Sequence, residues 1–315
     1  MNRKAVIFGI RGHRLTNNEK LLFRKAKPWG IMLFSRNIKN IFQLKNLIDD
    51  IKNFFNDKKY PILIDQEGGK VSRLNKIINL NFFSQNFFGL LYNKDKKLFL
   101  NKYEIYINKV CDILKNIGIN INTVPVLDVR RKKSHNIIGS RSFSENSAVV
   151  SNLGKLCIGF YEKNKIGTVI KHMPGLGLSK CDSHYKMPTI RANKKELTKK
   201  DFKPFKACKS LFAMTAHAVY TKYDPYNTAT HSKIIINKVI RNHMNFKGLL
   251  ISDDISMKSL KYSLEENALK ALRAGCNLVL HCNGNIREMS KLIKVIPRID
   301  KFTQKKTTHF YKFLG

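Results

Sequence analysis

Eight short apolar runs alternate along the chain with segments of helical periodicity, and no other feature constrains the fold as strongly. The runs occupy residues 5–10, 30–34, 60–64, 122–126, 168–170, 212–216, 248–251 and 277–280. The helical pattern is clearest over residues 41–55, 103–117 and 264–274, where apolar side chains recur every three or four positions. Eight strand–helix units within 315 residues predict an α/β protein with a single (β/α)8 TIM-type barrel, and a doubly wound sheet is the alternative.

The chain shows no sign of a second domain or of export. No internal repeat or linker interrupts it, so residues 1–315 are predicted to form one catalytic barrel domain. The apolar run near the amino terminus is too short for a signal peptide, and no run approaches the roughly eighteen residues of a membrane span. The six cysteines show no C-x-x-C spacing. A cytoplasmic protein without a metal or other cofactor is therefore predicted.

The formal net charge of +37 raises the question of a polyanionic partner. Proteins that bind nucleic acid usually gather their basic residues in one patch or arm. Here the lysines are spread along the chain, in pairs such as Lys96-Lys97, Lys194-Lys195 and Lys305-Lys306. We therefore expect no specific nucleic-acid partner, although the charge would help to collect an anionic substrate.

Polar and charged residues follow seven of the eight apolar runs. They are Arg36-Asn37, Asp65 with Glu67, Asp128, Lys171-His172, His217, Asp253-Asp254 and Asn283. In a parallel barrel these positions converge on the carboxyl-terminal face, where barrel enzymes place their active sites. The set combines carboxylates, cations, imidazoles and amides, which suits a substrate rich in hydroxyl groups, such as a sugar.

The segment from Lys171 to Pro188, KHMPGLGLSKCDSHYKMP, concentrates reactive side chains in a glycine-containing loop. Within it, Asp182 stands two residues before His184. A neighbouring carboxylate can fix the tautomer of an imidazole and favour its charged form, as a proton-transfer catalyst requires. A lone Asp-x-His is more often an ordinary polar loop, but a whole string of this composition is seldom accidental.

Segments between Pro28 and Asn283 resemble glycoside hydrolase family 3, in particular its short bacterial NagZ-type β-N-acetylglucosaminidases. They are PWGIMLFSRN, PILIDQEGGKVSRL, NTVPVLDV, NIIGSRSFS, the 171–188 loop and VIRNHMNFKGLLISDDIS. The resemblance implies a (β/α)8 barrel that hydrolyses β-linked N-acetylglucosamine. Two positions differ from the family pattern K-H-F-P-G-H-G, because this chain has Met173 and Leu176.

The resemblance also implies roles for individual residues. The family's sugar-binding positions correspond to Asp65, Arg73, Arg141, Lys171 and His172.

The segment that closes in SDDIS is similar to the family's active-site signature, and it gives Asp253 the place of the nucleophile. A carboxylate at a strand end can attack an anomeric carbon to form a glycosyl-enzyme, so the configuration would be retained. Taken alone, Asp254 is an alternative attacker. The D-S-H loop corresponds to the proton donor of the NagZ-type members, with His184 as the acid/base and Asp182 orienting it.

The sequence therefore predicts a retaining exo-β-N-acetylglucosaminidase. By resemblance, its substrate is a small carbohydrate from recycled peptidoglycan, N-acetylglucosamine linked to (anhydro-)N-acetylmuramic acid or its peptides. Alternatives are another β-glycosidase, a glycoside phosphorylase in which phosphate replaces water in the second step, and a sugar-binding homologue without chemistry. The sequence does not determine the oligomeric state.

Overall fold

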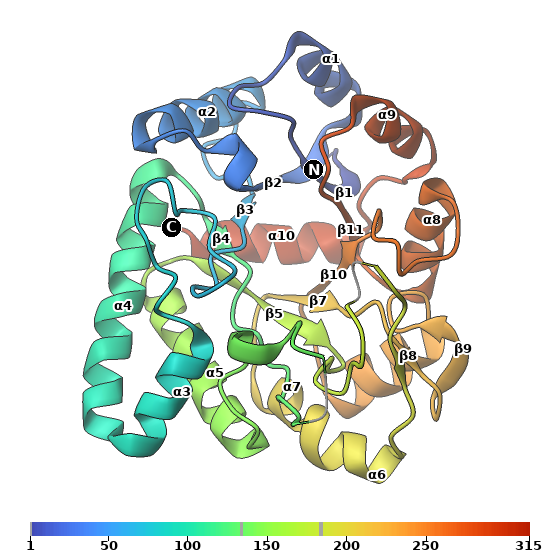
Figure 1. The fold of residues 1–315 in the computed structure, drawn as a ribbon. Coiled ribbons are helices and arrows are strands. Elements are labelled where there is room, and N and C mark those ends of the chain that lie inside the picture. The colour runs from blue at the N-terminus through green and yellow to red at the C-terminus, as the bar shows by residue number, and fades with distance from the viewer. Residues whose placement is uncertain (1, 133–134, 183–184) are drawn as a thin grey trace.

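A computed structural model describes residues 2–132, 135–182 and 185–315, and it contains the predicted barrel. Eight parallel strands close in the order β1-β11-β10-β7-β5-β4-β3-β2 (Figure 1). Their bounds are β1 Lys4–Gly9, β2 Pro28–Leu33, β3 Ile62–Ile64, β4 Ile121–Asn122, β5 Gly167–Met173, β7 Phe212–Thr215, β10 Leu249–Asp254 and β11 Leu278–His281. Each strand overlaps one predicted apolar run, so the barrel prediction is confirmed.

Helices surround the barrel (Figure 1). The α-helices are α1 Asn17–Ala26, α2 Ile41–Phe54, α3 Gln85–Lys94, α4 Lys96–Ile117, α5 Ser147–Lys163, α6 Lys194–Glu196, α7 Lys203–Ala207, α8 Leu264–Ala274, α9 Ile286–Val295 and α10 Lys301–Phe313. The 3₁₀-helices are η1 Ser35–Asn37 and η2 Gly139–Arg141, and the π-helices are η3 Leu197–Asp201 and η4 Ile235–His243. Helix α4 begins before the predicted residue 103 because the side chain of Asp95 caps it, accepting a hydrogen bond from the Leu98 N–H.

Helix α10 covers the amino-terminal end of the barrel and lies across the ring of strands in Figure 1. Its Phe310 ring meets that of Phe212, the first residue of β7, with 5.1 Å between the ring centroids. Its Thr307 accepts a hydrogen bond of 2.8 Å from the indole N–H of Trp29, near the start of β2. These contacts fill the amino-terminal end of the barrel, and the strand-end residues predicted to form the site lie at the opposite end.

Strand β4 is shorter than the predicted run of residues 122–126. Pro125 carries no N–H and so cannot donate to the strand ladder. The pairing resumes beyond it as an isolated bridge between Val126 and Lys171. The chain after β4 therefore still runs beside β5, although it is not a regular strand.

A second, three-stranded sheet was not predicted. It contains β6 Thr189–Ile190, β8 Val219–Tyr220 and β9 Asp224–Thr228, in the order β6-β8-β9. It joins the loop after β5 to the loop after β7, both at the carboxyl-terminal end of the barrel. Among the described residues, no helix is both long and apolar enough to cross a bilayer.

Candidate active site

A cavity of about 320 Å³ lies at the carboxyl-terminal ends of the barrel strands. Its lining includes Asp253 and all five residues predicted to bind the sugar, Asp65, Arg73, Arg141, Lys171 and His172. They come from the loop after β3, from η2, and from the ends of β5 and β10. The barrel thus brings together six of the eight predicted site residues.

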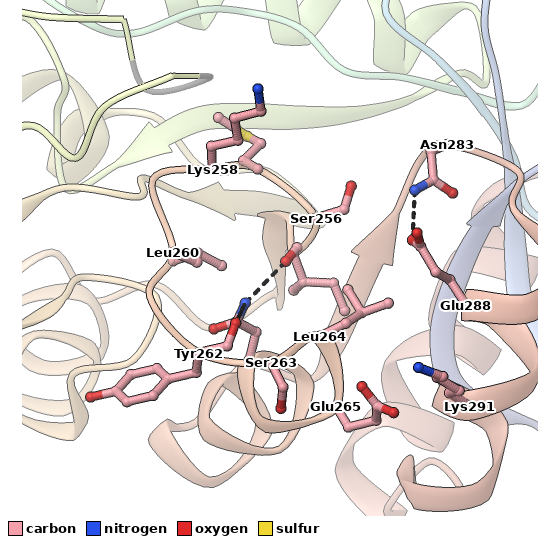
Figure 2. A pocket seen from close by; sticks show the side chains of 13 residues that line it. Ser256, Lys258, Leu260, Tyr262, Ser263, Leu264, Glu265, Asn283, Glu288 and Lys291 are labelled. Atoms are coloured by element: carbon pink, nitrogen blue, oxygen red, sulfur yellow. Dashed lines mark hydrogen bonds between the residues drawn. The ribbon is translucent and has the colours of Figure 1, made fainter.

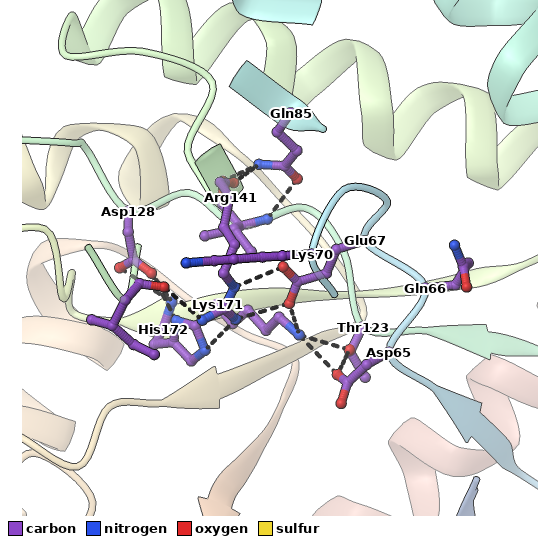
Figure 3. Close-up of polar contacts among 12 residues, drawn as sticks. Asp65, Gln66, Glu67, Lys70, Gln85, Thr123, Asp128, Arg141, Lys171 and His172 are labelled. Carbon is purple, nitrogen blue, oxygen red and sulfur yellow. Dashed lines mark hydrogen bonds and ion pairs between the residues drawn. The ribbon is translucent and has the colours of Figure 1, made fainter. Parts of the chain in front are cut away.

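Asp65 lies between two cations in this pocket, and Figure 3 shows its contacts with Lys171 and Thr123. Its Oδ1 is 2.9 Å from the Lys171 Nζ, and its Oδ2 is 3.1 Å from an Arg73 Nη. Burial alone would raise the pKa of Asp65, but the charges of Lys171 and Arg73 outweigh burial and hold this pKa well below its usual range. Asp65 is therefore an ionised acceptor, suited to sugar hydroxyl groups.

Glu67, which had no assigned role in the sequence prediction, holds two of the predicted sugar ligands in place. The Arg141 Nε and Nη2 each lie 2.8 Å from one of its carboxylate oxygens, and the Lys171 Nζ lies 2.7 Å from Oε1 (Figure 3). Burial would raise the pKa of Glu67, but Arg141 and Lys171 outweigh burial and lower this pKa to about 2. The charge of Glu67 thus fixes where both cations stand in the pocket.

Replacement of Glu67 by glutamine is expected to lower the free energy of unfolding at pH 7 by about 3–5 kcal/mol, the usual cost of removing one member of a buried ion pair. Because its pKa is lowered, ionised Glu67 stabilises the folded state fully above the ordinary carboxyl pKa of 4.5. This contribution is lost as the pH falls toward about 2. Urea unfolding of both proteins at neutral pH and at about pH 3, between the two pKa values, measures the difference in the free energy of unfolding. A difference that failed to narrow in acid would contradict this role.

The imidazole of His172 is held by a buried carboxylate, Asp128. The His172 Nδ1 lies 2.7 Å from the Asp128 Oδ2, and the His172 Nε2 lies 3.4 Å from an Arg141 Nη (Figure 3). The Asp128 Oδ1 accepts a hydrogen bond of 2.6 Å from the main-chain N–H of Leu176. The Asp128 side chain is fully buried. The sequence prediction listed Asp128 only as a strand-end residue, without a role.

Leu176 stands where the family pattern has histidine. Its side chain is buried and lines the pocket, and its main-chain N–H binds Asp128. The neighbouring Gly175 carbonyl accepts a hydrogen bond of 2.7 Å from the Tyr220 hydroxyl. The hydrogen bonds that hold this turn use main-chain atoms of residues 175 and 176. Leucine at position 176 therefore changes the side chain in the pocket wall but not these hydrogen bonds.

Two adjacent carboxylates end β10, and their hydrogen bonds differ. The Asp254 Oδ1 accepts hydrogen bonds from the Ser256 N–H at 3.1 Å, the Ser256 hydroxyl at 2.8 Å and the Cys282 N–H at 3.3 Å. The Asp253 Oδ1 accepts from the Asp254 N–H at 2.8 Å. Although both residues line the pocket, the Asp254 carboxylate is engaged in the turn that follows the strand. The assignment of Asp253 as the attacking carboxylate remains the prediction drawn from the family resemblance.

His217 contacts the main chain at the end of β10. Its Nε2 is 3.0 Å from the Asp254 carbonyl oxygen, and its Nδ1 is 2.7 Å from the Thr230 hydroxyl. Burial lowers the pKa of His217, although the charge of Asp253 opposes this shift. His217 therefore contacts the main chain of the strand end that carries both carboxylates.

Of the predicted acid/base pair, the structure describes Asp182 but not His184. His184 lies outside the described residues, and Asp182 is not among the described residues that line the pocket. The Asp182 charge nevertheless acts on Lys70, which lines the pocket. Burial and Arg141 lower the Lys70 pKa, whereas Glu67 and Asp182 oppose this shift. Within the described ranges, no cluster of three or more His, Cys, Asp or Glu residues could hold a metal ion.

A second cavity, of about 470 Å³, adjoins the first, and Met257 lines both. It lies between the loop after β10 and helices α8 and α9 (Figure 2). The Asn267 side chain donates to the carbonyl oxygens of Ile255 at 3.3 Å and Tyr262 at 3.1 Å, which closes this loop. The hydrogen bonds beside this cavity thus hold the segment that follows Asp253.

Comparison with known proteins identifies the family. The sequence-family model of the glycosyl hydrolase family 3 N-terminal domain matches residues 9–308 of this chain. A β-hexosaminidase of Neisseria meningitidis is 32% identical over 287 residues, which cover 89% of this chain and 78% of the relative. A β-hexosaminidase of Actinobacillus pleuropneumoniae is 30% identical over 286 residues, covering 88% of this chain and 81% of the relative.

The fold is also similar to solved structures. The crystal structure of NagZ from Neisseria gonorrhoeae in complex with N-trifluoroacetyl-D-glucosamine matches with a TM-score of 0.88 at 29% sequence identity. The match covers 98% of this chain and 90% of the NagZ chain. Together with the family match over most of its length, this likeness shows that the chain belongs to glycosyl hydrolase family 3 and is a glycoside hydrolase.

Proposed function

We propose that this glycoside hydrolase is a retaining exo-β-N-acetylglucosaminidase that removes N-acetylglucosamine from (anhydro-)N-acetylmuramic acid fragments of peptidoglycan. The β-hexosaminidase relatives support release of a β-linked N-acetylhexosamine. One observation carries the proposal: a carboxylate at a barrel strand end, Asp253, shares a pocket with five residues suited to bind hydroxyl groups. The peptidoglycan fragment, the cytoplasmic location and a single catalytic domain remain predictions from the sequence.

The pocket suits a single terminal sugar. Its volume of about 320 Å³ lies at the lower end of the range for small-molecule sites, about 300–1,000 Å³. Ionised Asp65 would accept hydrogen bonds from sugar hydroxyl groups, and Arg73, Arg141 and Lys171 would donate them. Apolar side chains, among them that of Leu176, would pack against the C–H groups of the ring. A pocket that holds one residue favours cleavage from the chain end, hence an exo-acting enzyme.

In the proposed first step, the Asp253 carboxylate attacks the anomeric carbon while the bond to the leaving oxygen breaks. His184 gives its proton to that oxygen, and Asp182 orients the imidazole. In the second step, a water molecule gives a proton to His184 and attacks the same carbon, which releases the Asp253 carboxylate. Two displacements at one carbon restore the β configuration.

Turnover of a chromogenic aryl β-N-acetylglucosaminide, compared with the matching aryl glucoside, tests the proposal. We expect rapid release of the aryl group from the first substrate only, with β-N-acetylglucosamine as the first-formed product by NMR. Preference for the glucoside would indicate another β-glycosidase. A glycosyl phosphate that forms only when phosphate is added would indicate a phosphorylase. Binding of N-acetylglucosamine without turnover would indicate a sugar-binding protein.

A further inference from the structure

We propose that Asp128 is a positioning residue of this active site, which couples the imidazole of His172 to the start of the loop that carries Asp182. This role rests on the proposed function, because it assumes that His172 faces the bound sugar. Asp128 follows the short strand β4 in the apolar segment NTVPVLDV. Its carboxylate is fully buried, where an unpaired charge would be costly.

The carboxylate of Asp128 is bound by both ends of one turn. The Asp128 Oδ2 lies 2.7 Å from the His172 Nδ1 and 3.3 Å from the His172 main-chain nitrogen. The Asp128 Oδ1 lies 2.6 Å from the Leu176 main-chain nitrogen. A hydrogen bond of 2.8 Å from the Gly175 N–H to the His172 carbonyl closes the turn. One side chain thus fixes an imidazole, the end of β5 and the first residues of the following loop.

These contacts decide which ring nitrogen carries a proton. An ionised carboxylate only accepts hydrogen bonds, so the Nδ1 of His172 must carry the proton that it shares with Asp128. The Nε2 of the same ring is then an acceptor at the pocket wall, where it faces a guanidinium N–H of Arg141 at 3.4 Å. Asp128 therefore sets both the direction of the ring and the hydrogen-bonding character that it presents to the sugar.

The loop beyond Leu176 packs directly on the segment that carries Asp128. A Cβ atom added to Gly177 would lie only 1.9 Å from the Val129 carbonyl oxygen, so the two main chains are in close contact. Further on, the Ser179 carbonyl accepts a hydrogen bond of 2.7 Å from the His135 N–H. A displacement of Asp128 would therefore move both His172 and the base of the loop that leads to Asp182.

Replacement of Asp128 by asparagine tests this role, because the side chain keeps its shape but one acceptor oxygen becomes a donating amide. That amide would meet N–H donors of His172, so the ring must change its tautomer or lose the contact. We expect kcat/KM for the aryl N-acetylglucosaminide to fall about 10–100-fold, by analogy with the loss when the carboxylate that orients a metal-binding histidine is removed. If Asp128 acts through His172, the losses caused by Asp128→Asn and His172→Gln will not add in the double variant.

¹⁵N NMR of the histidine side chains in the wild-type protein tests the assignment without any substitution. We expect a protonated Nδ1 for His172, assigned by its disappearance in His172→Gln, and an unprotonated Nδ1 would overturn the proposal. This measurement does not require turnover, so it separates failure of the proposal from failure of the proposed function, which would appear as an inactive wild-type enzyme.

Asp201→Asn is the matched control. Asp201 is another buried acidic residue beside the same turn, with its Cβ 3.1 Å from a Cβ atom built on Gly175. Its carboxylate pairs with Arg131. We expect this variant to keep the wild-type His172 resonance and a kcat/KM close to that of the wild type. An equal loss in both aspartate variants, or additive losses in the double variant, would reduce Asp128 to a structural residue.

Discussion

Replacing Asp253 by alanine is expected to reduce turnover of an aryl N-acetylglucosaminide by several orders of magnitude while the fold is retained. Asp253 lies at the end of β10 and lines the pocket beside the proposed sugar ligands. Removing the attacking group of an enzyme that works through a covalent intermediate commonly costs on the order of 10⁴–10⁶-fold in kcat. Steady-state kinetics measure the loss, and thermal unfolding monitored by circular dichroism checks that the variant is folded.

Three further measurements identify the nucleophile. A fluorinated N-acetylglucosaminyl donor that traps the glycosyl-enzyme should label Asp253, as located by fragmentation of the labelled peptide. Added azide should enter the space left in Asp253→Ala and form a glycosyl azide of α configuration, because only one displacement then occurs. Asp254→Asn is the control and should still accumulate the labelled intermediate. A label on Asp254 would overturn the assignment.

The barrel could be predicted because of how parallel strands are buried. Such strands are covered on both faces and appear in the sequence as continuous apolar runs. All six residues of β2, Pro28–Leu33, are buried. The helices between the strands bury only one face, so their apolar residues recur at helical spacing. The change between these two patterns, repeated eight times, indicates the barrel.

Three strands, and the extent of a fourth, could not be predicted, and the reasons are physical. β6 and β8 contain two residues each, which is too short for any periodic pattern, and β9, Asp224–Thr228, is rich in polar residues. β4 lies in an apolar run, but pairing is interrupted by Pro125. Apolar character alone does not show where a proline removes a hydrogen bond.

The composition of the pocket was predictable from topology, whereas its pairings were not. The carboxyl ends of parallel strands must meet, so strand-end residues were expected to share one face. The partners are far apart in sequence, since Arg141 binds Glu67 across 74 positions and His172 binds Asp128 across 44. One signal was available for Asp128, because a carboxylate within the apolar segment NTVPVLDV needs buried partners.

The second large effect on activity is predicted for His184, whose role as proton donor rests on the D-S-H motif and on the family resemblance. If His184 protonates the leaving oxygen, His184→Ala should slow substrates with poor leaving groups, such as a disaccharide, by roughly 10²–10⁴-fold. An activated aryl group leaves without a proton, so the first step should be nearly unaffected for it. Because the same residue activates water in the second step, the variant should then accumulate glycosyl-enzyme, seen as a burst of aryl release and by mass spectrometry.

The Asp182→Asn variant separates proton transfer from sugar binding. It keeps the His184 ring but removes the charge that is proposed to orient the ring and raise its proton affinity. We therefore expect the same dependence on the leaving group in milder form. His172→Gln is the contrast: loss of a proposed sugar ligand should slow both substrates similarly, because both present the same sugar to the pocket. If His184→Ala behaved like His172→Gln, His184 would be a binding residue. The proton donor would then have to be another titratable group near the leaving oxygen.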